Sequence, residues 1–402
     1  MKNIVLVGLV HDSNLGDRVI YEAMRGFLDR CLAEIGMGEV ELRCMDISGR
    51  SISPQSSDNN NIGTRLLSKA AASARRHLSR TKAGRNKILI PNLRRKTLGK
   101  CKELIDQNTK AIIFTGGGLI KFKQQYCHHY IDVITEFADL RGIPVMLSGV
   151  GVEGYDEQNK DCILLKKALN RKCVKMITTR DDIDLLNRSY ITDRSIITAR
   201  VADPACSVSD FYRPQNTEKR YIGLGLVREG LFKNYGVSFG KQQMLDLWKG
   251  ICRELDARGY EYKIFTNGLH SDYKFAEEFV QDMGMDRKRD ILIPRPVETK
   301  ALEDTIAGFK AVIACRLHAA IIAYSYAVPG VELVWNRKQI MFGESIGHRE
   351  RFITSDKFDP KLIVDAMEKA LAEGYDEKHR TEYCKTTKKY IDIFLRGIAD
   401  KK

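Results

Sequence analysis

The stretch KAVIACRLHAA, residues 310–320, carries the most information in this chain, because a run of apolar strand formers ends abruptly in an arginine and a histidine. In an extended segment, side chains two positions apart point to the same side, so Arg316 and His318 are expected to face the same way. The residues after them, 319–328, predict a buried helix that ends at a Pro-Gly pair. Arg316 and His318 are therefore expected between the end of a strand and the start of a helix, where open α/β sheets place their ligands.

The chemistry of these two side chains suits anion binding and proton transfer. A helix amino terminus favours an anion, and a guanidinium group can hold a carboxylate or a phosphate through two parallel hydrogen bonds. An imidazole beside it can move a proton near neutral pH. The alternative is a core histidine beside a surface arginine, which a single Arg-x-His pattern does not exclude.

Outward from this stretch, short apolar strands alternate with helical patterns along nearly the whole chain. This alternation predicts an α/β protein with parallel sheets covered by helices. In the first half we expect strands at residues 4–10, 41–45, 111–114, 145–148, 176–178 and 196–197, and helices at 18–35, 131–141, 163–171 and 183–189. After a polar break at 203–220 we expect strands at 221–227, 262–265, 291–293 and 310–315, and helices at 242–258, 273–283 and 299–308.

The expected architecture is two Rossmann-like domains that face one another across a central cleft. A chain of 402 residues is long for a single core and fits two domains of ordinary size. We place the N-terminal domain at residues 1–212 and the C-terminal domain at 213–375, followed by a C-terminal helix at 376–402. The sequence does not settle whether that helix packs back on the first domain.

Composition favours a globular protein of the cytoplasm. The first apolar run, 4–10, is expected to be a strand and not a signal peptide, and no stretch reaches the length needed to cross a bilayer. The ten cysteines include no CxxC pair, which favours reduced thiols. Cys127, His128 and His129 could offer metal ligands, but no second pair of Cys or His accompanies them, so we expect no metal.

The net charge of +14 is concentrated in one segment, since residues 62–102 carry thirteen Lys or Arg and no acidic residue. They belong to a predicted basic insertion at 51–102, which begins with a Ser- and Asn-rich linker. An anionic membrane surface, a lipid-linked phosphate or an anionic polymer would suit this charge, and a solvated insertion without a partner is the alternative. Nucleic acid is not expected, because the segment has no aromatic residue on which bases could stack.

Other predicted strand ends also carry residues that could bind a ligand or take part in catalysis. After the first strand, Gly16 permits a tight turn, and Asp17 is expected to cap a helix that begins at Arg18. The strand at 111–114 is expected to end in Gly116, Gly117 and Gly118, whose backbone N–H groups would be open to an oxyanion or a sugar.

Two further segments contain charged residues near predicted strand ends. The sequence RDDID at 180–184 resembles a DxD metal site, but acidic residues are expected at a helix start anyway, and we favour the capping role. Arg228 follows a glycine-containing strand and could face the same cleft as Arg316.

These elements, in this order, resemble the polysaccharide pyruvyl transferase family over most of the chain. The motifs that carry the resemblance are NLGD at 14–17, TGGG at 115–118, TRD at 179–181, ADPA at 202–205, GLGLVR at 223–228, RLHA at 316–319, and Pro329-Gly330 with Trp335 and Lys338. The resemblance implies a glycosyltransferase-B-like fold. It also implies an enzyme that moves the enolpyruvyl unit of phosphoenolpyruvate onto two hydroxyls of a sugar, in a polysaccharide or its lipid-linked precursor, leaving a cyclic ketal and phosphate.

The resemblance also implies roles for particular residues. On the C-terminal, donor side, Arg316, Leu317 and His318 would bind the donor, with His318 as the acid, and Arg228 and Lys338 would add positive charge. On the N-terminal, acceptor side, the candidates are Asp17 as a base, with Asn14, Gly116, Gly117, Gly118 and Arg180 as contacts. No cofactor is implied beyond phosphoenolpyruvate as a co-substrate, and no metal is required. Two departures from the family pattern, Asp184 and the GVEG turn at 151–154, concern the acceptor more than the donor.

Two other functional classes remain open at this point. A glycosyltransferase that uses a nucleotide sugar would need the same two-domain cleft and anion site, because fold does not determine function. A non-catalytic protein that docks on an anionic surface through residues 62–102 would work without His318. The expected location is the cytoplasm, with peripheral contact at the inner face of the cell membrane if the basic segment binds lipid. The acceptor sugar and the oligomeric state are not predicted.

Overall fold

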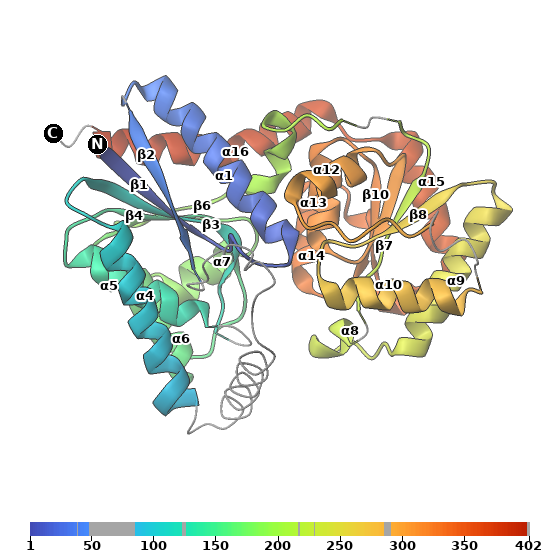
Figure 1. The fold of residues 1–402 in the computed structure, drawn as a ribbon, viewed down its shortest axis with the longest axis horizontal. Helices are drawn as coiled ribbons and strands as arrows, with labels where there is room; N and C mark the ends of the chain where they lie inside the picture. The colour runs from blue at the N-terminus through green and yellow to red at the C-terminus, as the bar shows by residue number, and fades with distance from the viewer. Residues whose placement is uncertain are drawn as a thin grey trace, which may run out of the picture.

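The computed structural model of the protein describes residues 1–37, 39–47, 85–122, 126–215, 218–228, 230–284 and 291–399. They form two parallel sheets with helices on both faces, one at each end of an elongated molecule (Figure 1). The strand order is β2-β1-β3-β4-β5-β6 in the first sheet and β11-β10-β9-β7-β8 in the second. The predicted α/β class with two Rossmann-like halves is confirmed.

Every strand pairing in both sheets is parallel, so the carboxyl ends of the strands lie along one edge of each sheet. The strands of the first sheet are β1 (Lys2–Gly8), β2 (Val40–Asp46), β3 (Thr109–Ile120), β4 (Val145–Val152), β5 (Val174–Thr179) and β6 (Ile197–Arg200). Those of the second are β7 (Ile222–Gly225), β8 (Tyr262–Phe265), β9 (Ala311–Ala314), β10 (Gly330–Val334) and β11 (Phe352–Thr354).

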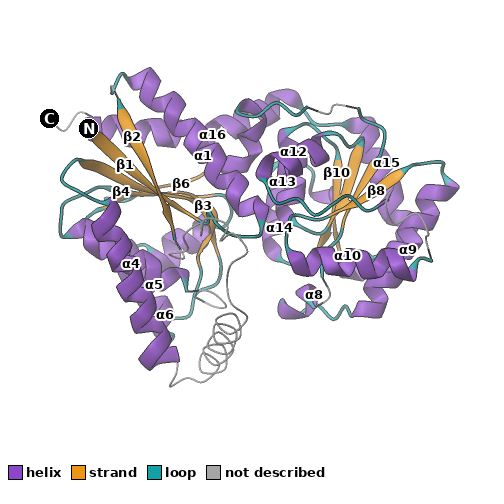
Figure 2. Ribbon diagram, viewed as in Figure 1, coloured by secondary structure: helices purple, strands orange, loops and turns teal. Residues whose placement is uncertain are grey.

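Helices alternate with these strands and cover both faces of each sheet (Figure 2). In the first half they are α1 (Leu15–Ile35), α4 (Ile90–Leu104), α5 (Cys127–Asp139), α6 (Lys160–Leu169) and α7 (Ile183–Leu185), with a 3₁₀ helix at Pro204–Asp210. In the second half they are α8 (Leu231–Asn234), α9 (Lys241–Ala257), α10 (His270–Asp282), α12 (Thr299–Ala307), α13 (Leu317–Ser325), α14 (Arg337–Ser345), α15 (Pro360–Glu373) and α16 (Glu377–Ala399).

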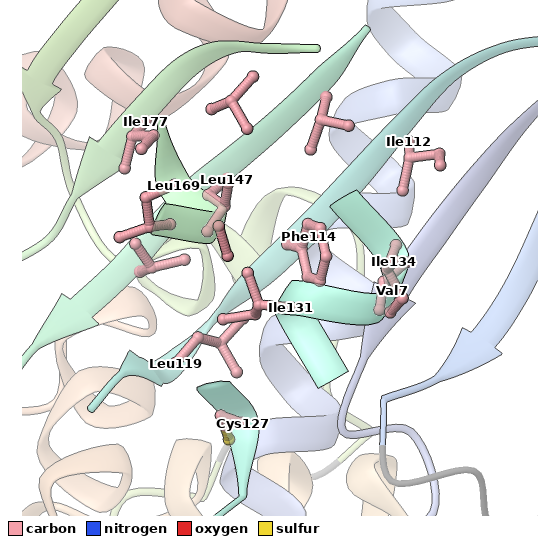
Figure 3. Packing of buried hydrophobic residues seen from close by; sticks show 14 of the residues in the cluster. Val7, Ile112, Phe114, Leu119, Cys127, Ile131, Ile134, Leu147, Leu169 and Ile177 are labelled. Atoms are coloured by element: carbon pink, nitrogen blue, oxygen red, sulfur yellow. The ribbon is translucent and has the colours of Figure 1, made fainter. Parts of the chain in front are cut away.

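The central strands are apolar because helices bury them from both sides. All eight residues of β4 are buried, as the continuous valine, leucine and methionine pattern of a parallel strand requires. On one face, Val7, Ile112, Phe114 and Leu147 pack against α5 and α6 (Figure 3). This core fixes the strand ends from which the candidate site residues project.

The other face of the first sheet is closed by α1 and by the last helix. Phe394 and Leu395 of α16 pack with Ile4 and Met24, so the chain returns to the first sheet after completing the second. The chain leaves the first sheet after β6 and enters the second at β7. The domain boundary predicted at 212/213 falls in this connection and stays a prediction.

Several element boundaries differ from the sequence-based expectation. The strand expected at 291–293 is only a single bridge between Leu292 and Ile264. The strands β10 and β11 were not predicted, because both are short and β10 begins at the glycine of a Pro-Gly pair that reads as a turn. The helix expected at 183–189 is α7 followed by a π-helical turn, Leu186–Tyr190.

Part of the predicted basic insertion, residues 51–84, lies outside the described residues. The remainder forms a π-helical turn, Arg85–Leu89, and the first turns of α4. Among the helices that the structure describes, none is long and apolar enough to cross a bilayer.

Candidate functional site

The two halves of the molecule contact each other where the carboxyl ends of their strands meet. The N–H of Leu15, at the start of α1, donates to the carbonyl of Asn267, which follows β8, at 3.0 Å. The starts of α1 and α13 are also in close contact, because a Cβ atom on Gly16 would lie 2.3 Å from Nδ1 of His318. Only glycine fits at position 16 without moving the imidazole.

Asp17 lies inside the first turn of α1. The helix begins at Leu15 with Asn14 as its N-cap residue, so the prediction that Asp17 caps a helix starting at Arg18 is wrong. Nδ2 of Asn14 donates to Oδ2 of Asp17 at 2.8 Å. The other oxygen, Oδ1, lies beside the backbone of Gly117, 3.5 Å from where a Cβ atom would be. The carboxylate is thereby held against the glycine triplet.

The glycine triplet lies within β3 and not after it. β3 continues to Ile120, with Gly117 opposite Val150 and a register shift before Ile120. Gly116 and Gly117 have φ values of +33° and +75°, which glycine adopts at little cost. The triplet is therefore an irregular, bulged continuation of the strand, and the expected free loop is not found. It leaves no room for side chains, because a Cβ atom on Gly118 would lie 2.9 Å from Nζ of Lys338.

His318 belongs to the first turn of α13. Because β9 ends at Ala314 and α13 begins at Leu317, the segment is not extended, and the expectation that Arg316 and His318 point the same way is wrong. Nε2 of His318 lies 3.3 Å from Nη1 of Arg180, across the contact between the two halves. Since a guanidinium only donates, Nε2 is the acceptor, and a neutral ring carries its proton on Nδ1.

The surroundings of His318 keep its imidazole neutral. Burial is the main reason that the pKa of His318 is lowered to about 4. The negative charge of Asp17 raises this pKa, and the positive charge of Arg180 lowers it. Lys338 and Arg316 lower it further. Three cations are therefore gathered around one imidazole at a helix amino terminus, which is an arrangement suited to an anion.

Arg180 is fixed in place by a buried carboxylate. Nη1 of Arg180 pairs with Oδ2 of Asp203, and both side chains are almost completely buried. The other oxygen of Asp203 accepts the N–H of Ala205 at 2.9 Å and so caps the 3₁₀ helix that follows β6. The ADPA motif thus orients Arg180 toward His318.

The guanidinium of Arg316 forms two parallel hydrogen bonds within its own half of the molecule. Its Nε and Nη2 donate to Asp272 at 2.9 and 3.0 Å, and the Asp272 side chain is fully buried. Oδ1 of Asp272 also accepts the backbone N–H of Arg228 at 3.1 Å. The two parallel bonds expected for a donor are therefore occupied by Asp272, and Nη1 of Arg316 is the part left for a ligand. The guanidinium of Arg228 has no hydrogen bond or ion pair within the described part of the chain.

Lys338 joins the two halves through Glu153. Its Nζ forms an ion pair with Oε1 of Glu153, whose Oε2 lies 3.5 Å from Nζ of Lys121. Burial would raise the pKa of Glu153, but Lys338 and Lys121 outweigh it and hold that pKa below its ordinary value. Burial lowers the pKa of Lys338, against the attraction of Glu153. The GVEG turn therefore supplies the counter-charge for Lys338.

Leu317 packs in the apolar core around α13 and lines a small cavity with Arg180, Asp181 and Lys338. The cavity has a volume of about 10 Å³, which is enough for about one water molecule and too small for a substrate. Next to it, Asp182 caps α7 by accepting the N–H of Leu185 at 2.9 Å, which confirms the capping interpretation of RDDID.

Several buried polar atoms at this junction lack a hydrogen-bond partner among the residues that the structure describes. They are Oδ1 of Asn14, Nε of Arg180, Oδ2 of Asp181 and Nδ2 of Asn267. A buried polar group without a partner costs about 1–3 kcal/mol, so such atoms usually meet a ligand or a water molecule. Because these four atoms lie where the strand ends of the two halves meet, the junction is a candidate binding region.

The structure thus brings most of the predicted site residues together around His318, but not all of them face it. Arg180, Lys338, Asp17 and the glycine triplet lie close to it, whereas Leu317 is a core residue and the fork of Arg316 faces Asp272. Sequence reasoning missed the carboxylates that hold the cations, which are Asp203, Asp272 and Glu153. Asp203 lies in the quoted ADPA motif and Glu153 in the quoted GVEG turn, whereas a signal for Asp272 is absent from the sequence.

Comparisons with known proteins identify the family and the fold of the chain. The family model described as polysaccharide pyruvyl transferase matches residues 14–337, a span that includes every candidate residue except Lys338. No curated protein sequence matches the chain significantly.

Solved structures resemble the chain over its whole length at low sequence identity. UDP-GlcNAc 2-epimerase from Methanocaldococcus jannaschii aligns with a TM-score of 0.58 and 13% identity, covering 98% of this chain and 100% of that chain. UDP-N-acetylglucosamine 2-epimerase from Rickettsia bellii aligns with a TM-score of 0.53 and 12% identity, covering 99% and 97%. These likenesses establish the glycosyltransferase-B-like fold alone.

Proposed function

Because this chain belongs to the polysaccharide pyruvyl transferase family, we propose that it transfers the enolpyruvyl unit of phosphoenolpyruvate to a glycan and releases phosphate. The observation that carries the proposal is the group of three cations, Arg180, Lys338 and Arg316, around His318. Phosphoenolpyruvate bears a carboxylate and a phosphate close together, so a site for it needs several fixed cations. The buried polar atoms of Asn14, Arg180 and Asn267 offer further contacts.

In the proposed reaction the enol carbon forms two bonds to sugar oxygens, while its π bond to the methylene carbon and its bond to the phosphate oxygen break. The two sugar hydroxyls lose one proton each. One of these losses is balanced by the proton added to the methylene carbon, which becomes a methyl group, and the other proton leaves with phosphate. The product is a cyclic ketal. Cations beside the departing phosphate stabilise its charge, an electrostatic contribution that is commonly the largest in catalysis.

His318 is the proposed acid for the methylene carbon. With a pKa of about 4, the free imidazole is neutral at pH 7 and cannot donate the proton. A bound donor brings negative charge against Arg180, Lys338 and Arg316, and a nearby negative charge raises the pKa of an imidazole. In this proposal, binding of phosphoenolpyruvate raises the pKa of His318, so the imidazole becomes protonated and can act as the acid.

Asp17 is the proposed base for the attacking hydroxyl. Its carboxylate belongs to the half of the molecule that faces α13, and Asn14 holds one of its oxygens at 2.8 Å. The other oxygen lies against the bulged glycine strand, in which Gly116 and Gly117 are buried and Gly118 is half-buried. The acceptor is proposed to bind along Gly116, Gly117 and Gly118, and no cofactor beyond the co-substrate is required.

A lipid-linked acceptor and a peripheral membrane contact belong to the same proposal. On α4 the residues Arg95, Lys96, Leu98 and Lys102 are exposed, with one acidic residue, Glu103, among them, and the exposed Ile88 contributes from the preceding turn. Cations interleaved with apolar side chains suit an anionic lipid surface. The proposed place of action is the cytoplasm, at the inner face of the membrane.

The direct test is to mix the purified protein with phosphoenolpyruvate and candidate glycans and to measure phosphate. We expect release only when both are present, loss of release in His318→Gln, and normal release in His348→Gln as the matched control. Release of a nucleoside diphosphate from a nucleotide sugar, without phosphate from phosphoenolpyruvate, would replace the proposal by a glycosyltransferase. Binding of glycan or lipid with no turnover of any donor would favour a non-catalytic role.

A further inference from the structure

Two histidines and an aspartate converge at the starts of two neighbouring helices on one face of the first sheet. His128 and His129 lie in the first turn of α5, and Asp161 lies in the first turn of α6. Oδ1 of Asp161 is 3.5 Å from Nε2 of His128 and 3.9 Å from Nε2 of His129. One ligand atom from each of the three residues lies within 4.8 Å of the other two, and the imidazole centroids are 4.3 Å apart.

These distances are longer than hydrogen bonds and close to the spacing of atoms that share an ion. Hydrogen bonds between nitrogen and oxygen are about 2.7–3.2 Å long. Two ligands at about 2.0–2.1 Å from a tetrahedral ion are about 3.3 Å apart. A small inward movement of His129 and Asp161 would therefore complete three positions of a tetrahedral site.

The environment of the three side chains also suits a metal. His128 is completely buried and His129 nearly so, whereas the Asp161 side chain is 23% exposed, which leaves a route from solvent. Two imidazoles and one carboxylate are a donor set that zinc and other divalent transition metals accept. The carboxylate would offset part of the ion's charge in this largely buried position.

We propose that His128, His129 and Asp161 bind one divalent transition-metal cation, with zinc as the favoured occupant, and that this ion ties α5 to α6. This proposal departs from our expectation that the chain binds no metal, which stays untested. The sequence pairs His128 with His129 but gives no sign that residue 161 folds against them.

The ion's place in the molecule indicates a structural role. Lys121 and Asp17 lie close enough to Cys127 for their charges to act on its thiol, which places the first turn of α5 beside the candidate site. An ion at His128 and His129 would hold this turn in position without taking part in the chemistry. The proposal therefore does not depend on the proposed reaction.

A second group of residues provides an internal control. His348, Glu350 and Glu373 also bring three ligand atoms within 4.8 Å, but this group has a single imidazole and two exposed carboxylates. Exposed carboxylates give up more favourable hydration when they bind a transition-metal cation than imidazoles do. This group should therefore bind cobalt or zinc more weakly than His128, His129 and Asp161 do.

The test is a titration of the full-length, chelator-stripped protein with Co²⁺, followed by visible absorbance, and then displacement by Zn²⁺. We expect one equivalent of Co²⁺ with tetrahedral absorbance, which Zn²⁺ removes. Saturation with Zn²⁺ at about a hundredfold excess over Kd should raise Tm by about 5 °C. Affinity should fall as the pH is lowered, because protons compete with the cation for the imidazole nitrogens.

Matched variants decide whether these three residues form the site. His129→Gln and Asp161→Asn should each lower Co²⁺ affinity at least tenfold, and His348→Gln should leave it unchanged. Asp161 is the decisive position because its side chain is partly exposed, and circular dichroism checks that the variant folds. The proposal is wrong if the parent protein shows no stoichiometric Co²⁺ absorbance, or if Asp161→Asn binds Co²⁺ as tightly as the parent.

Discussion

His318 combines a proposed role as an acid with a pKa of about 4, so that the free imidazole is neutral at pH 7. We predict that phosphoenolpyruvate raises this pKa, because its charge offsets Arg180 and Lys338. NMR titration of the imidazole Cε1–H, assigned with His318→Gln, should show a pKa near 4 in the free protein and a higher value with the donor. An unchanged or lower pKa in the complex would remove His318 as the acid. Loss of a general acid typically costs about a hundred- to ten-thousandfold in rate.

Arg316 and Lys338 are predicted to tolerate exchange of their charged groups poorly, for different reasons. Arg316→Lys loses the fork that holds the buried Asp272, so both the Tm and the apparent affinity for phosphoenolpyruvate should fall. Lys338→Arg should also be damaging, because Nζ lies beside the backbone of Gly118 and Gly151 and a guanidinium is bulkier. The measurements are thermal unfolding and the donor dependence of phosphate release.

Lys357→Gln, at an exposed position after β11, is the control for these exchanges. A parent-like unfolding curve together with a parent-like donor dependence for Arg316→Lys would contradict the importance of the Asp272 pair.

At the residue scale, the sequence identifies chemistry better than geometry. Arg316 and His318 stand out because charged residues interrupt an apolar pattern, and both do lie at the start of α13. Their directions could not be predicted from the sequence. The strand β9 ends at Ala314, two residues before Arg316, so an extended segment does not continue through His318. Asp272 is 44 residues away in the chain, so its contact with Arg316 depends on the tertiary fold and leaves no local signal.

At the scale of elements, α4 is predicted to bind anionic lipid through its exposed basic residues. Replacing Arg95, Lys96 and Lys102 by Gln should reduce retention on vesicles that contain anionic lipid. The retention of the parent should weaken with salt, because the Debye length falls from about 30 Å at 0.01 M to about 8 Å at 0.15 M. Flotation of vesicles with bound protein measures both effects.

The control for α4 is the triple replacement of Lys357, Lys361 and Lys369 by Gln on the second half of the molecule. Equal retention of the α4 variant and the parent would dismiss this surface. Arg94 is unsuitable for the test, because it pairs with the buried Asp132 at 2.5 Å and its loss would disturb the packing of α4 on α5.

The element pattern was predictable where hydrophobic periodicity is long and failed where turn residues lie inside an element. Strands β1, β4 and β8 and helices α1 and α9 follow directly from apolar runs and helical spacing. Glycines predict a strand end, yet in β3 they form a bulge that remains paired with β4. The neighbouring strand supplies the hydrogen bonds that keep such a segment in the sheet, and it is invisible to local patterns.

At the scale of the whole molecule, Glu303 makes the contact between the two halves sensitive to pH. Burial raises the pKa of Glu303 to about 7, although the hydroxyl of Tyr326 donates to its carboxylate at 3.0 Å, and Glu22 of α1 adds to the increase. An unfolded glutamate has a pKa of about 4.3, so the folded protein binds an extra proton between about pH 4.3 and 7. Stability contributed by this group is therefore lost as the pH rises through that window.

The predicted consequence is that Glu303→Gln stabilises the protein at high pH. The gain in the free energy of unfolding should grow from pH 5 to pH 8, where we expect about 2–3 kcal/mol. Urea unfolding at the two pH values measures it, with Glu298→Gln, at an exposed neighbouring position, as the control. A gain that is the same at pH 5 and pH 8, or no gain at all, would contradict the raised pKa.

The most direct test of the central claim is to follow phosphoenolpyruvate labelled with ¹³C at its enol carbon, in the presence of the parent protein and a glycan acceptor. We expect the labelled carbon to appear as a ketal carbon bonded to two glycan oxygens. The glycan should gain the mass of one pyruvate less one water, and one phosphate should be released for each ketal. Label recovered only as free pyruvate, or as an enol ether joined to a single oxygen, would contradict it.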